Sequence, residues 1–457
     1  MNNRRMRQGF AYDPNAIFKL LVYSRIISPG SKAQAFADKG SFIDRTDFSA
    51  DDMYRCLSFL ARYERELVAW VDDAIAKMRP RSTESVFYDV TNYYFEIEQE
   101  DGLKRRGVSK EHRPSPIIQM GLMLDSEGIP LDYMLFEGSD NDCTTLMPVM
   151  KDMRARHKAK HMVIVADKGL NTSDNIAACI LDENGFIFSQ SVRRATEGLK
   201  GWVLDDAGYA GGEDFRIKDR ITQKQITVTD PSGKKKKVDV TVRQVAFWSR
   251  DFAIRAKAER QAVIEKSLAC VKRGGISAAK AHTAVRYVKD TAVVAATGEA
   301  AEHVYELDGE RIACDAQMDG YYCLITNELD KSAAEVIDIY RGLWRIEDTF
   351  KVTKSVLEAR PVYVSRNDRI HAHFLICYVA LVILRLIQAD LGWKHSAQEI
   401  ADDIASMNGT LMKENHYLFG YRTHLCDMLG RLCGIDLSRR MLSAKEMRDI
   451  LAKTKKG

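Results

Sequence analysis

Apolar side chains in the first 80 residues recur at the three- and four-residue spacing of helices. One run covers residues 16–27 and stops at the Ser-Pro-Gly of residues 28–30. A second run begins after Ser49, a residue type favoured as a helix N-cap, and continues to Ile75. We therefore predict a helical N-terminal region over residues 1–80.

The pattern changes at residue 85, where β-branched and aromatic residues predict a strand. Two further strands separated by a turn, a helix, a short apolar strand, a second helix and a last strand follow. This is the element order of a ribonuclease H-like fold, in which the first and fourth strands are neighbours. The expected elements cover residues 85–95, 117–124, 131–136, 144–157, 161–166, 171–182 and 185–192.

The following stretch interrupts that order. A Lys-rich turn at residues 230–237 lies between two alternating runs, which predicts a hairpin. A helix over residues 255–271 and strands at 284–288 and 304–307 complete a predicted β-rich insertion with one helix. Trp248 and the lysines of the turn are candidates for nucleic-acid contact by stacking and charge, although Trp248 also suits a core position.

A strand at residues 321–326 returns the chain to the core. One helix is then predicted from the capping-box pattern of residues 332–335 to Lys354, a second over 372–391, and a helical remainder to 457. The most apolar run, residues 374–387, is too short to span a bilayer and contains Arg385, so we expect a buried helix and no membrane association. We expect an α/β protein with a helical N-terminal region at 1–80, a core in two parts at 81–195 and 318–392, an insertion at 196–317, and a helical region at 393–457, which is a candidate for dimerisation.

Four side chains of the predicted 332–354 helix fall on one stripe at about 100° per residue. They are Tyr340, Glu347, Lys351 and Lys354. A carboxylate followed by lysines one and two turns later suits a site that holds a divalent ion beside a phosphate backbone. The alternative is an amphipathic helix with ordinary Glu–Lys pairing.

Two other acids lie in strand contexts. Asp89 lies within the first core strand, and Asp167 ends the short apolar strand at 161–166. An acid in such a segment is costly to bury unless it is paired or holds a metal. The alternative for Asp89 is a strand end that faces solvent.

A basic, glycine-punctuated loop follows the first core strand. Such a charge run is often only a solvated surface, but beside an acidic metal site it suits contact with DNA phosphates. Its basic residues are Lys104, Arg105, Arg106, Lys110 and Arg113.

Composition narrows the class of protein. The chain has 457 residues, 46% hydrophobic and 29% charged, which describes a globular protein of more than one domain. A net charge of only +4 means that any nucleic-acid surface depends on local basic clusters. Nine scattered cysteines with no Cys-x-x-Cys pair indicate reduced thiols and a cytoplasmic location.

In their order along the chain, these motifs resemble those of bacterial insertion-sequence transposases of the DDE class, with their Tyr…Arg…Glu…Lys signature. Tyr340, Glu347 and Lys354 match the signature. Leu343 stands where the signature has an arginine, and Arg345 lies on another side of the helix and cannot replace it.

The resemblance implies that Asp89, Asp167 and Glu347 are catalytic acids that bind Mg²⁺, with Mn²⁺ able to substitute. It implies DNA as the partner, both the terminal inverted repeats and the target, and a homodimer in the synaptic complex. The helical region at 1–80 is a candidate for binding the DNA ends. Bacterial cytoplasm, at the nucleoid when DNA is bound, is the expected location. The predicted DNA contacts are Tyr340, Lys351, Lys354 and the basic residues of the loop.

Two alternatives stay open at this point. A DNA-binding protein with an inactive core would account for Leu343 and a short N-terminal region. Glycoside hydrolysis by a carboxylate pair would leave the lysine stripe without a use.

Overall fold

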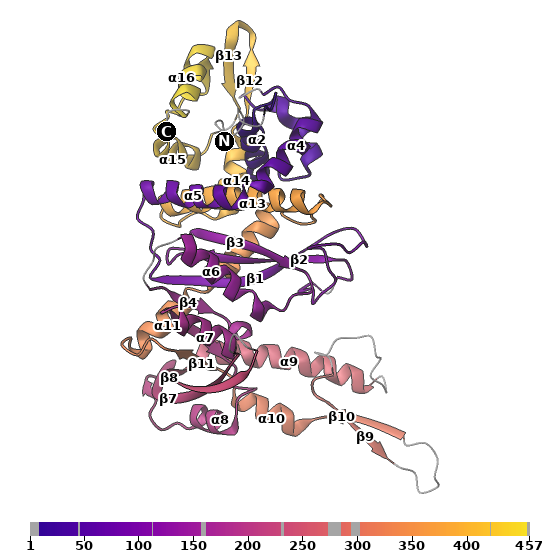
Figure 1. Cartoon of the computed structure of the whole chain (residues 1–457), viewed down its shortest axis with the longest axis vertical. Coiled ribbons are helices and arrows are strands. Elements are labelled where there is room, and N and C mark those ends of the chain that lie inside the picture. The colour runs from indigo at the N-terminus through magenta and orange to yellow at the C-terminus, as the bar shows by residue number, and fades with distance from the viewer. Residues whose placement is uncertain are drawn as a thin grey trace. The chain divides into compact units, whose positions relative to one another are not determined.

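The computed structural model describes residues 9–43, 46–111, 113–156, 161–229, 233–272, 285–293, 302–420 and 422–454 (Figure 1). The chain divides into two compact units. The first unit combines Met1–Met162 with Gly342–Gly457, and the second is Val163–Arg341.

A helical layer in the first unit is built around α13. This helix is long and apolar enough to cross a membrane by length and composition alone, but 72% of its most apolar window is buried inside the protein. It runs between the sheet of this unit and helices α2 and α4 (Figure 1), which is the position of a core helix. The layer comprises α2 (Pro14–Ile27), α3 (Lys32–Ala37), η1 (Asp38–Ser41), α4 (Ala50–Arg62), α5 (Glu64–Met78), α13 (Asn367–Asp390) and α14 (Ala397–Ser406).

Two predicted helix ends are confirmed, the end of α2 at Ile27 and the start of α4 after Ser49, but the run predicted to Ile75 divides into α4 and α5. Ser49 caps α4 in a capping box with Asp52.

Polar contacts hold the N-terminal helices within the layer. Arg25 of α2 donates to the carbonyls of Leu357 and Glu358 at 3.3 and 3.2 Å. Lys32 of α3 is buried, with its Nζ 3.1 Å from Nδ1 of His373 on α13. The N-terminal helices are therefore tied by polar contacts to the last third of the chain.

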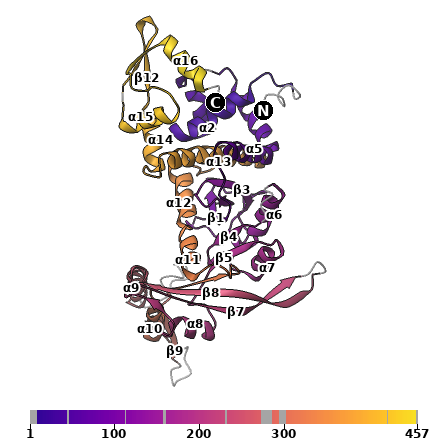
Figure 2. The same ribbon diagram turned by 90° about the vertical axis from the view of Figure 1, so that its left-hand side faces the viewer.

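The sheet of the first unit is an antiparallel meander of β1 (Ser85–Tyr94), β2 (Ile117–Leu124) and β3 (Pro130–Glu137). All of β2 is buried, which explains why Gln119 is its one polar residue. Asp89 pairs in register with Leu122 of β2. Helix α12 (Trp344–Lys351) lies along β1 (Figure 2), and η2 (Asp142–Thr144) and α6 (Leu146–Arg156) follow β3.

The sheet of the second unit is mixed. β4 and β5 are parallel, and the other neighbours are antiparallel in the order β4-β5-β11-β8-β7-β6. The strands are β4 (Val163–Ala166), β5 (Gly185–Gln190), β6 (Ala210–Gly211), β7 (Phe215–Thr229), β8 (Lys235–Ser249) and β11 (Tyr321–Thr326), with β9 (Val288–Val293) and β10 (Glu302–Leu307) as a separate pair. The helices are η3 (Lys168–Leu170), α7 (Ser173–Leu181), α8 (Glu197–Leu204), α9 (Arg250–Lys272), α10 (Gly309–Gln317) and α11 (Ala333–Arg341).

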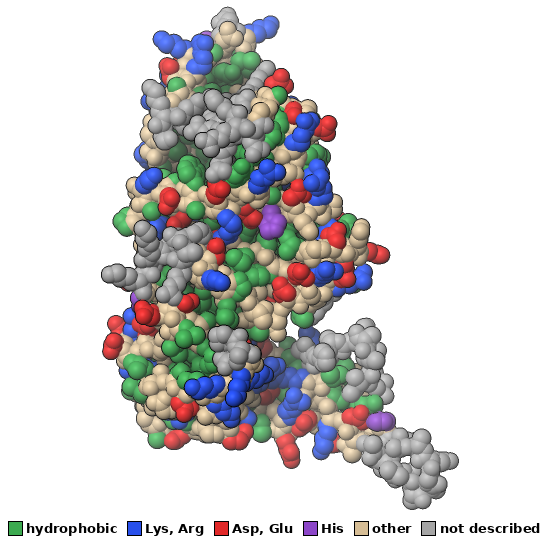
Figure 3. All heavy atoms as spheres, viewed as in Figure 1, with side chains coloured by type: hydrophobic (Ala, Val, Ile, Leu, Met, Phe, Trp, Pro, Cys, Tyr) green, Lys and Arg blue, Asp and Glu red, His purple; other side chains and the backbone are tan. Residues whose placement is uncertain are grey.

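The predicted insertion contains the expected hairpin, β7 and β8, and β8 pairs with the core strand β11. Lys and Arg side chains gather over this hairpin (Figure 3). Residues 230–232 of its turn and residue 284 lie outside the described residues, and the strand expected at 284–288 begins instead at Val288. The expectation of one helix was wrong, because α8 and α10 accompany α9. Leu199 and Val203 of α8 pack against Ala246 and Cys323, and this burial outweighs the helix-weakening glycines 198 and 201.

The single helix predicted over 332–354 is interrupted. Its capping box is confirmed, since Ser332 Oγ accepts from the Glu335 amide and Glu335 accepts from the Ser332 amide. However, α11 ends at Arg341 and α12 begins at Trp344. A Cβ on Gly342 would lie 2.4 Å from the Phe87 ring, so the chain needs glycine here for close approach to β1. Tyr340 and Glu347 therefore belong to different helices and to different units.

The all-helical C-terminal region was also a wrong prediction. It contains a small antiparallel sheet whose strands are too short for an alternating pattern to show in the sequence. Its elements are β12 (Gly409–Met412), η5 (Lys413–Asn415), β13 (His416–Phe419), α15 (His424–Leu432), β14 (Met441–Ser443) and α16 (Ala444–Thr454).

Candidate active site

Asp89 is held by the pairing of β1. It is half-buried, between the fully buried Tyr88 and Val90, whose side chains point to the other face of the strand. Strand pairing on β2 therefore fixes the backbone from which the carboxylate projects. Asp89 is the only carboxylate of β1. Because the strand is paired, this predicted site residue projects from a rigid backbone.

Glu347 is carried by α12 in the same unit. Ile346, Thr349 and Phe350 are buried and anchor this short helix, while Glu347 is exposed. Lys351, one turn later, is also exposed. Both side chains thus lie where solvent or a substrate can reach them.

Lys354 lies close to Asp89. It belongs to a π-helical turn, η4 (Val352–Val356), and its Nζ donates to Thr91 Oγ1 at 2.7 Å, two residues beyond Asp89 on β1. Burial, with a smaller contribution from the charge of Lys110, lowers the pKa of Lys354 to about 8, and the Asp89 carboxylate opposes this shift. The Nζ of Lys354 lies 3.9 Å from the Glu111 carboxylate, so the simple pairing with Glu347 is not what positions it.

The basic residues of the loop that follows β1 have different roles in the structure. Lys104 is only 1% exposed and donates to the Ser365 carbonyl at 2.7 Å, so in this structure it supports the fold and offers no charge to a phosphate. Lys110 donates to the carbonyl of Val90, next to Asp89, and Arg113 lies 4.0 Å from the Tyr94 ring. Arg105 lies 3.6 Å from Glu137, and Arg106 is exposed.

Asp167 follows β4 directly in the second unit. Its Oδ1 accepts from Ser189 of β5 at 2.7 Å and, at the long distance of 3.5 Å, from Tyr340 of α11. Burial raises the pKa of Tyr340, as does Tyr322, whose hydroxyl is 3.1 Å away, so the phenol stays protonated as a donor. Tyr340, predicted as a DNA contact, is placed here as a partner of the predicted acid. Oδ2 of Asp167 has no hydrogen-bond partner among the described residues.

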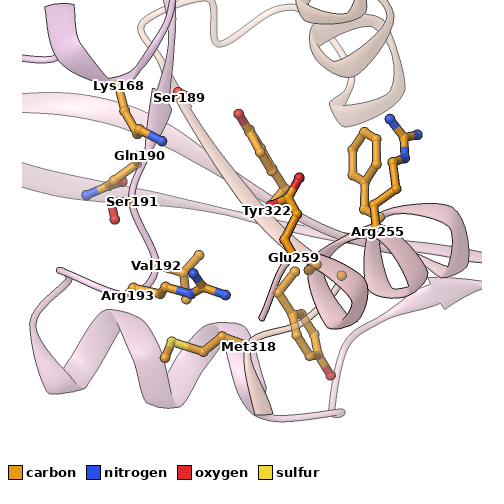
Figure 4. A pocket seen from close by; sticks show the side chains of 14 residues that line it. Lys168, Ser189, Gln190, Ser191, Val192, Arg193, Arg255, Glu259, Met318 and Tyr322 are labelled. Atoms are coloured by element: carbon orange, nitrogen blue, oxygen red, sulfur yellow. The ribbon is translucent and has the colours of Figure 1, made fainter. Parts of the chain in front are cut away.

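Ser189 also lines a cavity of about 370 Å³ in the second unit (Figure 4). Among its described lining residues are Lys168 of η3, Arg193 of the loop after β5 and Arg255 of α9, with Glu259 as the one acid. The sequence pattern did not point to these residues. The available signals were Lys168 beside Asp167 and Ser189 directly after the apolar run at the start of β5.

Within the described ranges, no three His, Cys, Asp or Glu side chains gather closely enough to hold a metal ion. Asp89 and Glu347 belong to the first unit and Asp167 to the second, and their convergence on one site stays a prediction. The donor chemistry fits a hard cation, since all three offer carboxylate oxygens and Oδ2 of Asp167 has no protein partner among the described residues.

A model of the transposase DDE domain family matches residues 89–383. The chain belongs to this family. The match begins at Asp89 and includes Asp167, Glu347 and Lys354. For this transposase, membership implies nuclease or transferase activity on DNA and the use of divalent metal ions. The expected ribonuclease H-like class, a mixed sheet flanked by helices, is confirmed.

Other comparisons are more distant. No curated protein matches the transposase. A solved structure described as a piggyBac transposase synaptic complex with hairpin DNA is similar at a TM-score of 0.39 and 8% identity. The likeness covers 86% of this chain and 80% of that one.

Proposed function

We propose that this transposase cleaves and joins DNA at the ends of an insertion sequence, with Asp89, Asp167 and Glu347 as the residues that hold Mg²⁺. The observation that carries the proposal is the family match, which begins at Asp89 and includes both other acids. The substrates are terminal inverted repeats and target DNA, the acting form is a homodimer in the synaptic complex, and the location is the bacterial cytoplasm.

The chain's own residues have distinct tasks in this proposal. Ser189 and Tyr340 orient Asp167 through Oδ1 and leave Oδ2 for a ligand. Lys354 brings a positive charge to Thr91 of β1, two residues after Asp89, where it can neutralise a phosphate. When bound, two divalent ions supply activation of the attacking oxygen and stabilisation of the leaving oxygen.

A cleavage assay tests the function directly. Purified protein is incubated with labelled linear DNA that carries the inverted repeats flanking its reading frame, with Mg²⁺, Mn²⁺ or a chelator. We expect strand cleavage at the repeat ends with either ion and none with the chelator. DNA binding without cleavage in either ion would support an inactive DNA-binding protein instead. Leu343, which is buried at the position of the signature arginine, is the observation that favours this second candidate.

Lys354→Ala tests the phosphate contact. If the ammonium meets a phosphate, its removal should reduce the slope of log affinity against log salt by about one unit. The affinity of the variant for repeat-end DNA is measured across a salt series at pH 7, below the pKa of about 8. The exposed Lys77 on α5 is a control that should leave the slope unchanged.

A different result would identify a structural lysine. Lys354 also binds Thr91, so its loss can loosen the π turn from β1. A lowered melting temperature with unchanged slope and affinity would reject the DNA contact.

A further inference from the structure

A groove in the first unit lies on another side of α12 from Glu347. Its volume is about 470 Å³. It is formed between α12, the end of α13 and the loop that leads into α14. The residues that matter for its chemistry are Trp344, Arg345, Arg385, Trp393, Lys394 and His395.

Two tryptophans at this groove expose much of their surface, 58% for Trp344 and 43% for Trp393. Trp393 has a left-handed backbone conformation, with φ of 60°, directly after Gly392. A bulky residue is strained at these backbone angles. A hydrogen bond of 2.7 Å from the Trp393 amide to the Gln388 carbonyl holds Trp393 in this conformation. The fold thus keeps a large indole at the surface when burial would be more favourable.

The floor of the groove is polar and tightly connected. Arg385 is 3% exposed and donates to Asp348 and Thr349, each at 2.8 Å. It also donates to Gln388, whose amide donates to the His395 carbonyl at 3.0 Å. The Nε of Arg385 has no hydrogen-bond partner among the described residues. Gln388, Asp348 and Thr349 therefore fix the guanidinium of Arg385 as the floor of the groove.

The charge of the groove is positive. Asp348 is the one carboxylate among the described residues that line the groove, and it is already paired with Arg385. Arg345 and Lys394 make no ion pair within the described part of the chain. A ligand that enters the groove meets aromatic faces together with uncompensated cations.

We propose that this groove binds an unpaired nucleotide of a DNA strand. The base stacks on an exposed indole, and its phosphate is bound by Arg345 and Lys394. Aromatic faces and a positive track are the combination that single-stranded nucleic acid requires. An apolar peptide would leave the cations of Arg345 and Lys394 without partners. The inference rests on the proposed action on DNA, but it concerns a separate surface.

Trp393→Ala tests the groove by equilibrium binding of a labelled oligo-dT strand to the full chain, with no metal present. Loss of one stacking platform should weaken binding about 5- to 100-fold, and Trp393→Phe should restore most of it. Affinity for blunt duplex DNA should stay within twofold. The matched control is Trp70→Ala, because Trp70 is 66% exposed on α5, away from the groove.

Two outcomes would overturn the inference. One is oligo-dT affinity in Trp393→Ala equal to that of the parent. The other is an effect of Trp393→Ala on oligomeric state in light scattering with unchanged oligo-dT affinity, which would make the groove a protein interface. Because the binding assay contains no metal, the groove can be confirmed in a chain that fails to cleave DNA, and cleavage can succeed while the groove fails.

Discussion

Asp89→Asn is expected to reduce strand cleavage by more than about 100-fold, since even outer-shell partners of metal ligands cost about 10- to 100-fold when mutated. The amide keeps the shape of the side chain on β1 but loses the charge that a divalent ion requires. Binding of repeat-end DNA should change little. Both quantities are measured on the same preparation, cleavage in Mg²⁺ and binding in its absence.

Lys354, which lies near Asp89, determines the pH at which binding has to be measured in this experiment. The Asp89 carboxylate raises the pKa of Lys354, so its replacement by an amide lowers that pKa further below its present value of about 8. Lys354 then loses its proton at a lower pH, and DNA binding would weaken for that reason alone. Binding is therefore compared at pH 6.5 as well as pH 8. The exposed Asp73→Asn on α5 serves as control, and an equal loss of binding and cleavage at both pH values would contradict a catalytic role.

Lys32→Met is expected to remove a pH dependence of stability from the first unit. Burial, with a further contribution from Arg25, lowers the pKa of Lys32 from 10.5 to about 7. Between these values the unfolded chain carries a proton that the folded chain has released. The free energy of unfolding contributed by Lys32 therefore rises with pH across this window, by up to about 1.4 kcal/mol per pH unit.

The measurement is chemical denaturation of parent and variant at pH 7, 8 and 9. For each protein the free energy of unfolding is plotted against pH. The difference between the two slopes gives the contribution of Lys32, because the other titrating groups are the same in both proteins. His373 loses a partner in the variant, which lowers stability by a similar amount at each pH, since burial keeps the pKa of this imidazole well below its usual value. Lys77→Met, at an exposed position, should keep the parent slope. A Lys32→Met slope equal to that of the parent would show that Lys32 stays protonated when buried.

Local patterns predicted most of the core elements, because strands such as β1 and β4 carry their signal within a few residues. They did not predict the break at Gly342, whose cause is the ring of Phe87, more than 250 positions earlier in the chain. The burial of Lys104 depends in the same way on Ser365. In the candidate site, the sequence pattern predicted the three acids and Lys354, and the convergence of the acids stays a prediction. Ser189 could not be identified, since its role depends on the parallel pairing of β5 with β4.

The contact of Arg25 with the end of the π turn affects how defective variants should be interpreted. Leu357 and Glu358, whose carbonyls accept from Arg25, directly follow the turn that carries Lys354, and Arg25 itself lies within the first 30 residues. A random screen for loss of transposition should therefore recover substitutions at Arg25 that leave the protein abundant. Mapped by sequence position alone, such alleles would be assigned to the N-terminal helices, although the turn that they disturb carries Lys354 beside β1.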